Sequence, residues 1–462
     1  MYKEQIDRYL ESKTEAMLED LKELVRIDSQ RTEAKEGMPY GEGPAKALDA
    51  ATRIMEKYGL KVTDYDHRVV AGDFGPAEKE LDILAHLDVV PVTDEWTVTK
   101  PFEPLVKDGR IYGRGTADDK GPAIAALYAI LAIKDLGLPL KKGVRLLLGS
   151  DEECGSSDLA YYYEKEEEAP CTFSPDADFP LINVEKARLA GPFTASYART
   201  EEESGVVLLE GGDKVNVVPA KAKIVLKGVD PDVLENACKE TAHLTGCQFT
   251  VEGNTVHVKG TSAHGSMPEC GNNALTAALK LVCSLPLPKT EGLDLLQGIA
   301  KLFSHGDTIG EALGIVMEDD ISGKLTMNLG VLHYGEGILR GELDCRAPVC
   351  ANDENLTIPV KQALAAYGIT FENELTEAHY VPEDLPFVQI LLGSYERYTG
   401  KEGKALSTGG GTYVHHLKRG VAFGCMSEEV DNHMHGDDEF MEIDTMVMSA
   451  KIFADVIMKI CG

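Results

Sequence analysis

The sequence is short of positive charge: 46 lysine and arginine residues stand against 77 aspartate and glutamate residues, giving a net charge of −31 at pH 7. Because the acidic residues are spread along the chain, the surface would repel a polyanion, which argues against nucleic-acid binding. The chain also lacks an apolar run approaching 18 residues, so we expect no membrane-spanning helix.

A leader segment and paired cysteines are missing as well. The first residues, MYKEQIDRYLESK, carry charges every few positions and no apolar signal-peptide core, which predicts a cytoplasmic protein. The ten cysteines are scattered without a C-x-x-C pair, so we expect reduced, mostly buried thiols.

The length of 462 residues exceeds one ordinary hydrophobic core and predicts two or three domains. Up to residue 186, the apolar runs LDILAHLD, GVRLLLG and CTFS alternate with helical patterns, which predicts an α/β domain with a mostly parallel sheet flanked by helices. Runs such as AKAKIVLKG and NTVHVKG then predict an α+β domain. We expect a catalytic domain of residues 1–186 and 386–462, with 187–385 inserted as a lid. Helical patterns occupy 2–26, 43–58, 122–136 and 444–460.

Histidine and acidic side chains follow the apolar runs where strands are expected to end. In LAHLDVVP, His86 and Asp88 are two positions apart, so on a strand they face the same way. The Asp88 carboxylate can then accept a proton from one imidazole nitrogen of His86 while the other nitrogen binds metal. In open α/β sheets, ligands bind beyond the carboxyl ends of the strands, so this edge is the expected functional site.

Further acidic clusters lie at similar points. Asp118 and Asp119 in GRGTADDKGP occupy a glycine-bounded turn, where a carboxylate can bridge two cations, although the pair could also cap the following helix. Glu152 and Glu153 end the run LLLGSDEE, so that one can ligate metal while the other acts as general base, unless they form a solvated turn. Asp176 in FSPDADFP and His435 in NHMHGDDE complete the candidate set.

The chain resembles the co-catalytic zinc exopeptidase superfamily of carboxypeptidase G, succinyl-diaminopimelate desuccinylase and carnosinase, and within it the PepV-like dipeptidases. The motifs in family order are HLDVVP, YGRGTADDKGP, the EE pair, FSPDADFP, NVVPA, GTSAHGSMP, HYVPE, GGGTY, RGVAFG and MHGDDE. The resemblance implies that Asp118 bridges two metal ions, one completed by Glu153 and His435, the other by His86 and Asp176. It also implies Glu152 as general base, Asp88 as the partner of His86, and a cis peptide between Asp118 and Asp119.

The same resemblance implies substrate-binding residues in the lid. His264 in GTSAHGSMP would stabilise the developing oxyanion, making lid closure a condition for catalysis. Asn216 in NVVPA and Arg346 in LDCRAP match positions that hold the substrate's C-terminal carboxylate or assist the oxyanion, with structural loop roles as the alternative. Backbone N–H groups near the same carboxylate would come from Gly409, Gly410, Gly411 and Thr412, and Asp178 could receive the substrate's free amine.

The expected function is hydrolysis of unblocked dipeptides, including β-alanyl or Xaa-His ones, by a water activated by two divalent metal ions. Mixed nitrogen and oxygen donors suit zinc, and manganese or cobalt fit the same set. The alternative is an N-acyl amino acid deacylase or desuccinylase, although such relatives often carry Glu where this chain has Asp176. A third reading is an inactive peptide-binding protein. In PepV-like relatives a large lid provides the surface that smaller relatives obtain by dimerising, so the resemblance implies a monomer rather than a homodimer.

Several other polar residues near these motifs are expected to be structural. His415, His416 and His433 are interpreted as structural or surface histidines, and only His435 of the two C-terminal histidines matches the family ligand. Cys154 directly follows the glutamates but is not expected to be a catalytic thiol.

Overall fold

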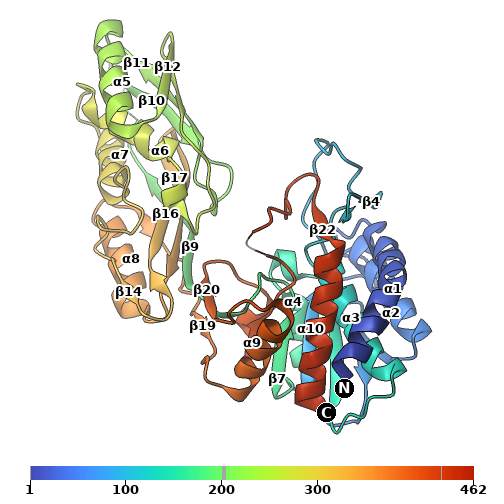
Figure 1. Ribbon diagram of the computed structural model, residues 1–462. Coiled ribbons are helices and arrows are strands. Elements are labelled where there is room, and N and C mark those ends of the chain that lie inside the picture. The colour runs from blue at the N-terminus through green and yellow to red at the C-terminus, as the bar shows by residue number, and fades with distance from the viewer. Residues whose placement is uncertain (1, 200–203, 428) are drawn as a thin grey trace. The chain divides into compact units, whose positions relative to one another are not determined.

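The computed structural model describes residues 2–199, 204–427 and 429–462, which form two compact units (Figure 1). The first unit comprises Met1–Val184, Tyr380–Leu406 and Gly411–Gly462, and the inserted unit comprises Glu185–His379 and Ser407–Gly410. The sequence pattern places the crossings after residues 186 and 385. It gives no sign that a short segment near residue 408 lies with the inserted unit.

A mixed sheet forms the centre of the first unit, with strand order β1-β2-β6-β3-β7-β21-β8-β19 and β20 paired with β8. The four central strands β6, β3, β7 and β21 are parallel, whereas β1, β2 and β8 pair antiparallel with their neighbours. The expected α/β class is therefore confirmed, and parallel pairing is concentrated in the middle of the sheet. The strands are β1 (Lys61–Tyr65), β2 (Val69–Phe74), β3 (Lys79–His86), β6 (Gly143–Gly149), β7 (Cys171–Ser174), β8 (Ile182–Glu185), β19 (His379–Tyr380), β20 (Leu406–Thr408) and β21 (Gly420–Ala422), beside a small sheet of β4 (Leu105–Lys107), β5 (Arg110–Tyr112) and β22 (Phe440–Glu442).

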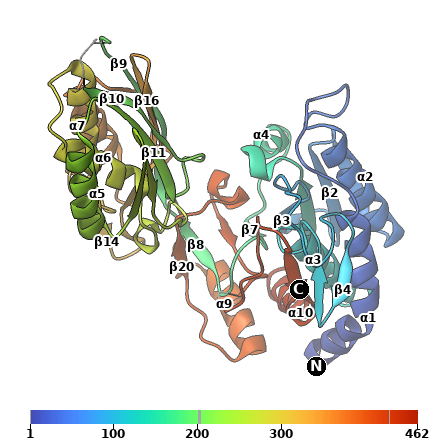
Figure 2. The ribbon, with the colours of Figure 1, turned by 90° about the horizontal axis from the view of Figure 1, so that it is seen from above.

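Helices cover both faces of this sheet (Figures 1 and 2). The helix α3 is buried along almost its whole length, because its Ala-, Ile- and Leu-rich sequence packs against the sheet and against α1 and α10. The helices predicted near residues 2, 43, 122 and 444 are all present. One face carries α1 (Tyr2–Val25), α2 (Glu42–Lys57), α3 (Lys120–Asp135), α9 (Pro386–Thr399) and α10 (Ile443–Cys461), and the other carries α4 (Ser157–Tyr163).

The alternation of side chains along β3 decides where its last residue points. Leu81, Ile83 and Ala85 join the core under α1, α3 and α10, whereas Leu84 joins the smaller core beside α4. Because side chains on a strand alternate between faces, His86 shares the face of Leu84. The strand order thus brings the ends of β3, β6 and β7 to one edge of the sheet, with His86 at that edge.

The inserted unit is an antiparallel sheet of order β12-β13-β11-β10-β16-β17-β9-β18 with helices packed on one face (Figure 1). Along β11, buried Ala222, Ile224 and Leu226 alternate with more exposed lysines, as expected for a sheet with one solvated face. Its elements are β9 (Ala187–Ser196), β10 (Gly205–Gly211), β11 (Lys221–Lys227), β12 (Gln248–Glu252), β13 (Thr255–Lys259), β16 (Thr326–Gly335), β17 (Ile338–Ala347), β18 (Thr370–Phe371), α5 (Pro231–Thr245), α6 (Ala274–Ser284), α7 (Glu291–Leu302) and α8 (Ile358–Ala365), with a separate pair β14 (Glu318–Asp319) and β15 (Gly323–Lys324). In the part of the chain that the structure describes, no helix is both long and apolar enough to cross a membrane.

Candidate metal centre

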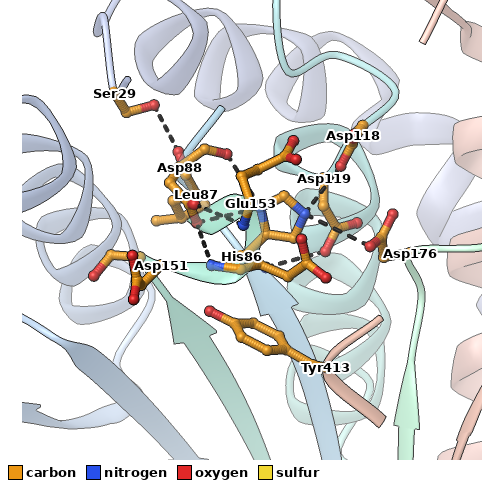
Figure 3. Close-up of polar contacts among 12 residues, drawn as sticks. Ser29, His86, Leu87, Asp88, Asp118, Asp119, Asp151, Glu153, Asp176 and Tyr413 are labelled. Carbon is orange, nitrogen blue, oxygen red and sulfur yellow. Dashed lines mark hydrogen bonds and ion pairs between the residues drawn. The ribbon is translucent and has the colours of Figure 1, made fainter. Parts of the chain in front are cut away.

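The five candidate metal ligands come from five separate segments of the first unit, and Figure 3 shows His86, Asp118, Glu153 and Asp176 among them. His86 is the last residue of β3 and is fully buried. Glu153 belongs to a single helical turn, η1 (Glu152–Cys154), that follows β6, and Asp176 lies two residues beyond β7. Asp118 lies in the loop before α3, and His435 lies in the loop before β22.

These five side chains meet at one point. The Nε2 atom of His86 lies 2.9 Å from Asp118 Oδ1 and 3.6 Å from Asp176 Oδ2. The Nε2 atom of His435 lies 2.7 Å from Asp118 Oδ2 and 3.3 Å from Glu153 Oε1. The two carboxylate oxygens of Asp118 therefore face different histidines, each of which has a second carboxylate beside it.

The arrangement of these atoms is compatible with bound cations. Although His86 Nε2 is close to Asp118, it is buried and makes no properly aligned hydrogen bond, and neither does the buried Oε1 of Glu153. Donor atoms of His86, Asp118 and Glu153 lie within 4.8 Å of one another, as do those of His86, Glu152 and Asp176. Donors bound to one zinc ion at about 2.0–2.2 Å with tetrahedral angles lie roughly 3.3–3.6 Å apart. The 3.6 and 3.3 Å separations above match this range, and the 2.9 and 2.7 Å separations are those of ion pairs. The residues present therefore fit metal ions.

The cluster also carries an excess of negative charge that a cation would compensate. Six carboxylates gather around two histidines, namely Asp88, Asp118, Asp119, Glu152, Glu153 and Asp176. Burial and neighbouring carboxylates raise the pKa of Glu152 and Asp119 well above the usual range and that of Glu153 to about 7. Burying like charges together is costly unless a cation compensates them.

The histidines take up part of this negative charge. Asp118 and Glu153 raise the pKa of His435 to about 11. Burial lowers the pKa of His86, but the carboxylates of Asp118, Asp176 and Asp88 outweigh it, and the pKa is raised well above its usual value. Burial likewise raises the pKa of Asp118, and contacts with both histidines reverse this, so that its pKa falls below the usual range.

Asp88 has a broader task than the sequence suggests. The Nδ1 atom of His86 lies 3.1 Å from the Asp88 backbone carbonyl and 3.4 Å from its Oδ1. The Asp88 carboxylate also accepts the backbone N–H groups of Glu152, at 3.2 Å, and Glu153, at 3.1 Å. One aspartate thus orients the imidazole and holds the turn that carries both glutamates.

The peptide bond between Asp118 and Asp119 is cis, as the family resemblance implies. Asp119 occupies the N-cap position of α3 but makes no side-chain capping hydrogen bond. Its Oδ2 instead accepts the backbone N–H of His86 at 3.1 Å, so the side chain ties the α3 loop to the end of β3.

Sequence reasoning missed several residues that hold this centre in place. Tyr413 packs edge-on against the His86 ring (Figure 3), with centroids 6.0 Å apart, and its hydroxyl donates to Asp158. The Asp158 carboxylate also accepts the N–H groups of Ser150 and Asp151, just before η1. The signal was weak: Tyr413 falls in GGGTY and Ser150 and Asp151 fall in LLLGSDEE, but Asp158, which joins them, falls in no motif noted above.

A second missed group holds the other side of the η1 turn. The Arg31 guanidinium donates to the fully buried carboxylate of Asp151 and to the backbone carbonyl of Cys154, at 3.2 Å. The hydroxyl and backbone N–H of Ser157 donate to the other oxygen of Asp151. Both ends of the turn that carries Glu152 are therefore fixed by Arg31.

In the inserted unit, the expected substrate-binding residues form a cluster of their own. The Gly265 N–H donates to the Asn216 carbonyl at 2.7 Å, which places the His264 loop beside Asn216. Arg346 donates to the backbone carbonyl of Gly409, and a Cβ on Gly409 would come within 2.7 Å of Ser266 Cβ.

The state of each polar group in this cluster limits what it can bind. The Nδ1 atom of His264 lies 2.6 Å from the Ser266 hydroxyl and 3.3 Å from the Ser266 backbone nitrogen, so Ser266 orients the imidazole ring. Arg346 is 7% exposed and already donates through Nε and Nη2 to Asp344, as well as to Gly409. Three of its five N–H donors are thus engaged.

The glycine-rich segment is divided between the units. Gly409 and Gly410 lie in the inserted unit, and the N–H of Gly410 donates to the Thr408 hydroxyl at 3.0 Å. Gly411 and Thr412 lie in the first unit, where the Thr412 hydroxyl accepts the N–H of Val414. Asp178 forms an isolated parallel bridge with Met426.

Comparison with known proteins follows the same motifs. The chain matches the model of Peptidase family M20/M25/M40 over residues 83–459. It is 35% identical to the YtjP protein of Bacillus subtilis (strain 168), covering 96% of this chain and 97% of that protein. It is 33% identical to the Beta-Ala-Xaa dipeptidase of Lactobacillus delbrueckii subsp. lactis, covering 97% and 96%. Human carnosine dipeptidase 1 shares the fold, with a TM-score of 0.61 at 15% identity over 100% and 99% of the two chains.

Proposed function

Since this chain belongs to peptidase family M20/M25/M40, a family of peptide-bond hydrolases, we propose that it is a metal-dependent dipeptidase acting on small unblocked dipeptides, β-alanyl and Xaa-His ones included. The observation that carries the proposal is the placement of Asp118 between His86 and His435, each with a further carboxylate beside it. The similarity to a Beta-Ala-Xaa dipeptidase along nearly the whole chain supports the substrate class.

The centre is proposed to hold two divalent ions. His86 and Asp176 would bind one, Glu153 and His435 the other, and Asp118 would bridge them. Imidazole and carboxylate donors suit zinc first, with manganese or cobalt as alternatives. Two such cations, when bound, would lower the pKa of a water and polarise the scissile carbonyl.

Glu152 is proposed to carry the proton during hydrolysis. Its carboxyl group lies at the same point as His86 and Asp176 and is not needed as a ligand in the scheme above. A carboxylate beside a metal-activated water can take a proton from that water and give it to the leaving amine. Asp88 would keep Glu152 in position through the hydrogen bond to the Glu152 backbone.

The cluster in the inserted unit is proposed to recognise the rest of the substrate. The imidazole of His264, whose ring Ser266 orients, would donate to the oxyanion. Asn216 would assist the oxyanion, and the two N–H groups of Arg346 left over from Asp344 and Gly409 would bind the C-terminal carboxylate. The backbone of Gly409, Gly410, Gly411 and Thr412 would border that carboxylate, and Asp178 would face the free amine.

An activity panel tests this proposal. Metal-free protein is reconstituted with zinc, manganese or cobalt and incubated with free dipeptides, including β-alanyl-histidine, and with N-acetyl and N-succinyl amino acids. We expect turnover of the free dipeptides that requires metal and is lost in Glu152→Gln. Preference for the blocked substrates would establish a deacylase instead. Dipeptide binding without turnover, with both metal sites filled, would establish an inactive binding protein.

A further inference from the structure

The acidic residues Asp437, Asp438 and Glu439, which closely follow His435, hold two other segments of the chain. Asp437 accepts the Thr93 hydroxyl at 2.7 Å, and Asp438 accepts the backbone N–H groups of Thr97 and Val98 at 2.9 and 2.8 Å. The third, Glu439, has no exposed surface and is directed at the loop that ends in Asp118. None of the three is a ligand in the centre described above.

Glu439 gathers the Asp118 loop around its carboxylate. Its Oε1 accepts the N–H of Ala117 at 2.8 Å and of Asp118 at 3.3 Å, and its Oε2 accepts the N–H of Gly115 at 3.1 Å. Its backbone carbonyl accepts the N–H of Gly113 at 3.0 Å. One side chain thus fixes the backbone up to and including Asp118.

Arg114, in the Asp118 loop, donates to the loop that carries His435. Its Nη1 donates to Glu439 Oε2 at 2.6 Å, and its Nη2 donates to the carbonyl of Gly436 at 2.9 Å. Arg114 is 2% exposed, and its guanidinium carbon lies 5.5 Å from the ring centroid of Trp96. The planar fork of arginine spans two acceptors at once, which an ammonium group cannot do with the same geometry.

We propose that Arg114 and Glu439 are positioning residues that set the separation of Asp118 and His435 and so prepare the site of the second cation. The inference rests on the proposed metal centre. The two loops are more than 300 positions apart in the chain, and the pair is a buried link between them. His435 depends on such a link because its side chain is 51% exposed and little packing holds it. Residues that orient metal ligands typically change metal affinity by about 10- to 100-fold when replaced.

A buried ion pair could serve stability alone, and the same unit contains a matched control. Arg145 is 7% exposed and donates to both oxygens of Asp82 at 2.8 and 2.7 Å, and Asp82 is fully buried. This pair joins β3 and β6 four residues before His86 and contacts neither the Asp118 loop nor the His435 loop in any hydrogen bond described. Replacing Arg145 should therefore reduce stability without altering the cation sites.

The experiment uses full-length metal-free wild type, Arg114→Lys and Arg145→Lys. Zinc and cobalt are titrated in, with affinity followed by calorimetry and the cobalt absorption spectrum, and the melting temperature of each metal-free protein is recorded. We expect Arg114→Lys to bind one cation normally and the other about 10- to 100-fold more weakly, with a changed cobalt spectrum. Arg145→Lys should lower the melting temperature and leave both affinities at the wild-type level.

Trp96 is the chain's one tryptophan and reports on the pair directly. In wild type, its emission should change as the second zinc equivalent binds, and in Arg114→Lys this change should move to about 10- to 100-fold higher zinc concentration. If Arg114→Lys does not fold, the same measurements are made on Glu439→Gln, whose side chain has the same size and keeps one oxygen acceptor. If neither variant folds, the change in wild-type Trp96 emission on binding of the second zinc ion decides.

The outcomes separate the pair from the centre it serves. Wild-type protein that binds no pair of cations would overturn the proposed metal centre and this inference together. Three results would overturn the positioning role alone. They are wild-type affinity for both cations in Arg114→Lys, an equal loss of cation affinity in Arg145→Lys, and a Trp96 emission that does not change when the second zinc ion binds.

Discussion

The carboxylate of Asp88 accepts the backbone N–H of Glu152 at 3.2 Å. The same residue faces His86 through its backbone carbonyl and through its carboxylate, at 3.1 and 3.4 Å. One buried aspartate therefore couples the orientation of a candidate ligand to the position of the candidate base. A change at Asp88 should disturb metal binding and turnover together.

Asp88→Asn tests this coupling. The oxygen of the introduced amide could accept one of the two N–H groups of Glu152 and Glu153, whereas the amide NH2 group would face the other donor. We expect metal affinity and kcat each to fall by about 10- to 100-fold. Calorimetric titration and steady-state kinetics measure the two effects, and a kcat loss at unchanged metal affinity would contradict the link to His86.

Glu152→Gln separates chemistry from binding. Because Glu152 is not a ligand in the proposed centre, both cations should remain while kcat falls by about 100- to 10,000-fold, the usual contribution of a general base. Metal content after dialysis and kcat at saturating zinc provide the measurement. Retention of most turnover would remove Glu152 from its role.

Asp118→Asn and Asp176→Asn form a contrasting pair. Asp118 faces both histidines, so its replacement should weaken the binding of both cations. Asp176 faces only His86, so its replacement should weaken one cation and spare the other. Metal analysis after dialysis against a weak chelator distinguishes one retained ion from none, and equal losses in the two variants would argue against a bridging Asp118.

The convergence of the ligands was predictable because it follows from strand order. Once His86, Glu153 and Asp176 are placed just beyond parallel strands β3, β6 and β7, the topology of the sheet brings them to one edge. His435 follows no such rule, since it lies in a loop: the cluster NHMHGDDE marked it as a candidate, and the family resemblance distinguished it from His433.

The supporting residues were not predictable, because each acts through partners distant in the chain. Arg114 meets Glu439 across 325 positions and Tyr413 meets Asp158 across 255, and no local pattern encodes either contact. Glu439 was visible only as the last residue of MHGDDE, and no local pattern gave it a role. Its burial and its three backbone donors emerge only when β22 pairs with β5.

Gly149 and Gly393 should respond in opposite directions to the same substitution. A Cβ on Gly149, the last residue of β6, would lie 2.0 Å from Tyr413 Oη and 2.5 Å from Asp158 Oδ2, whereas a Cβ on Gly393, inside α9, meets nothing within 4 Å. Gly149→Ala should destabilise the protein by about 1–3 kcal/mol or more through overpacking. Gly393→Ala should stabilise it by about 0.5–1 kcal/mol through helix propensity. Urea unfolding of both variants measures these changes. If Gly149→Ala leaves the free energy of unfolding unchanged, the side chains of Tyr413 and Asp158 can move aside without cost.

His305 should give the inserted unit an acid-sensitive stability. Burial lowers the pKa of His305 below 6.5, and the nearby Lys280 acts in the same direction, despite a hydrogen bond from the ring Nε2 to the Thr245 carbonyl at 3.2 Å. Because the unfolded chain then binds a proton at higher pH than the folded one, stability is intact above pH 6.5 and falls as the pH drops through and below that value. Hydrogen exchange of α6 and α7 between about pH 7.5 and 5 in wild type and His305→Gln measures the effect. In His305→Gln the stability should depend less on pH, because the titrating group is gone while the introduced amide can still donate to the Thr245 carbonyl. If the stability of the variant depends on pH as steeply as that of wild type, another group causes the acid sensitivity.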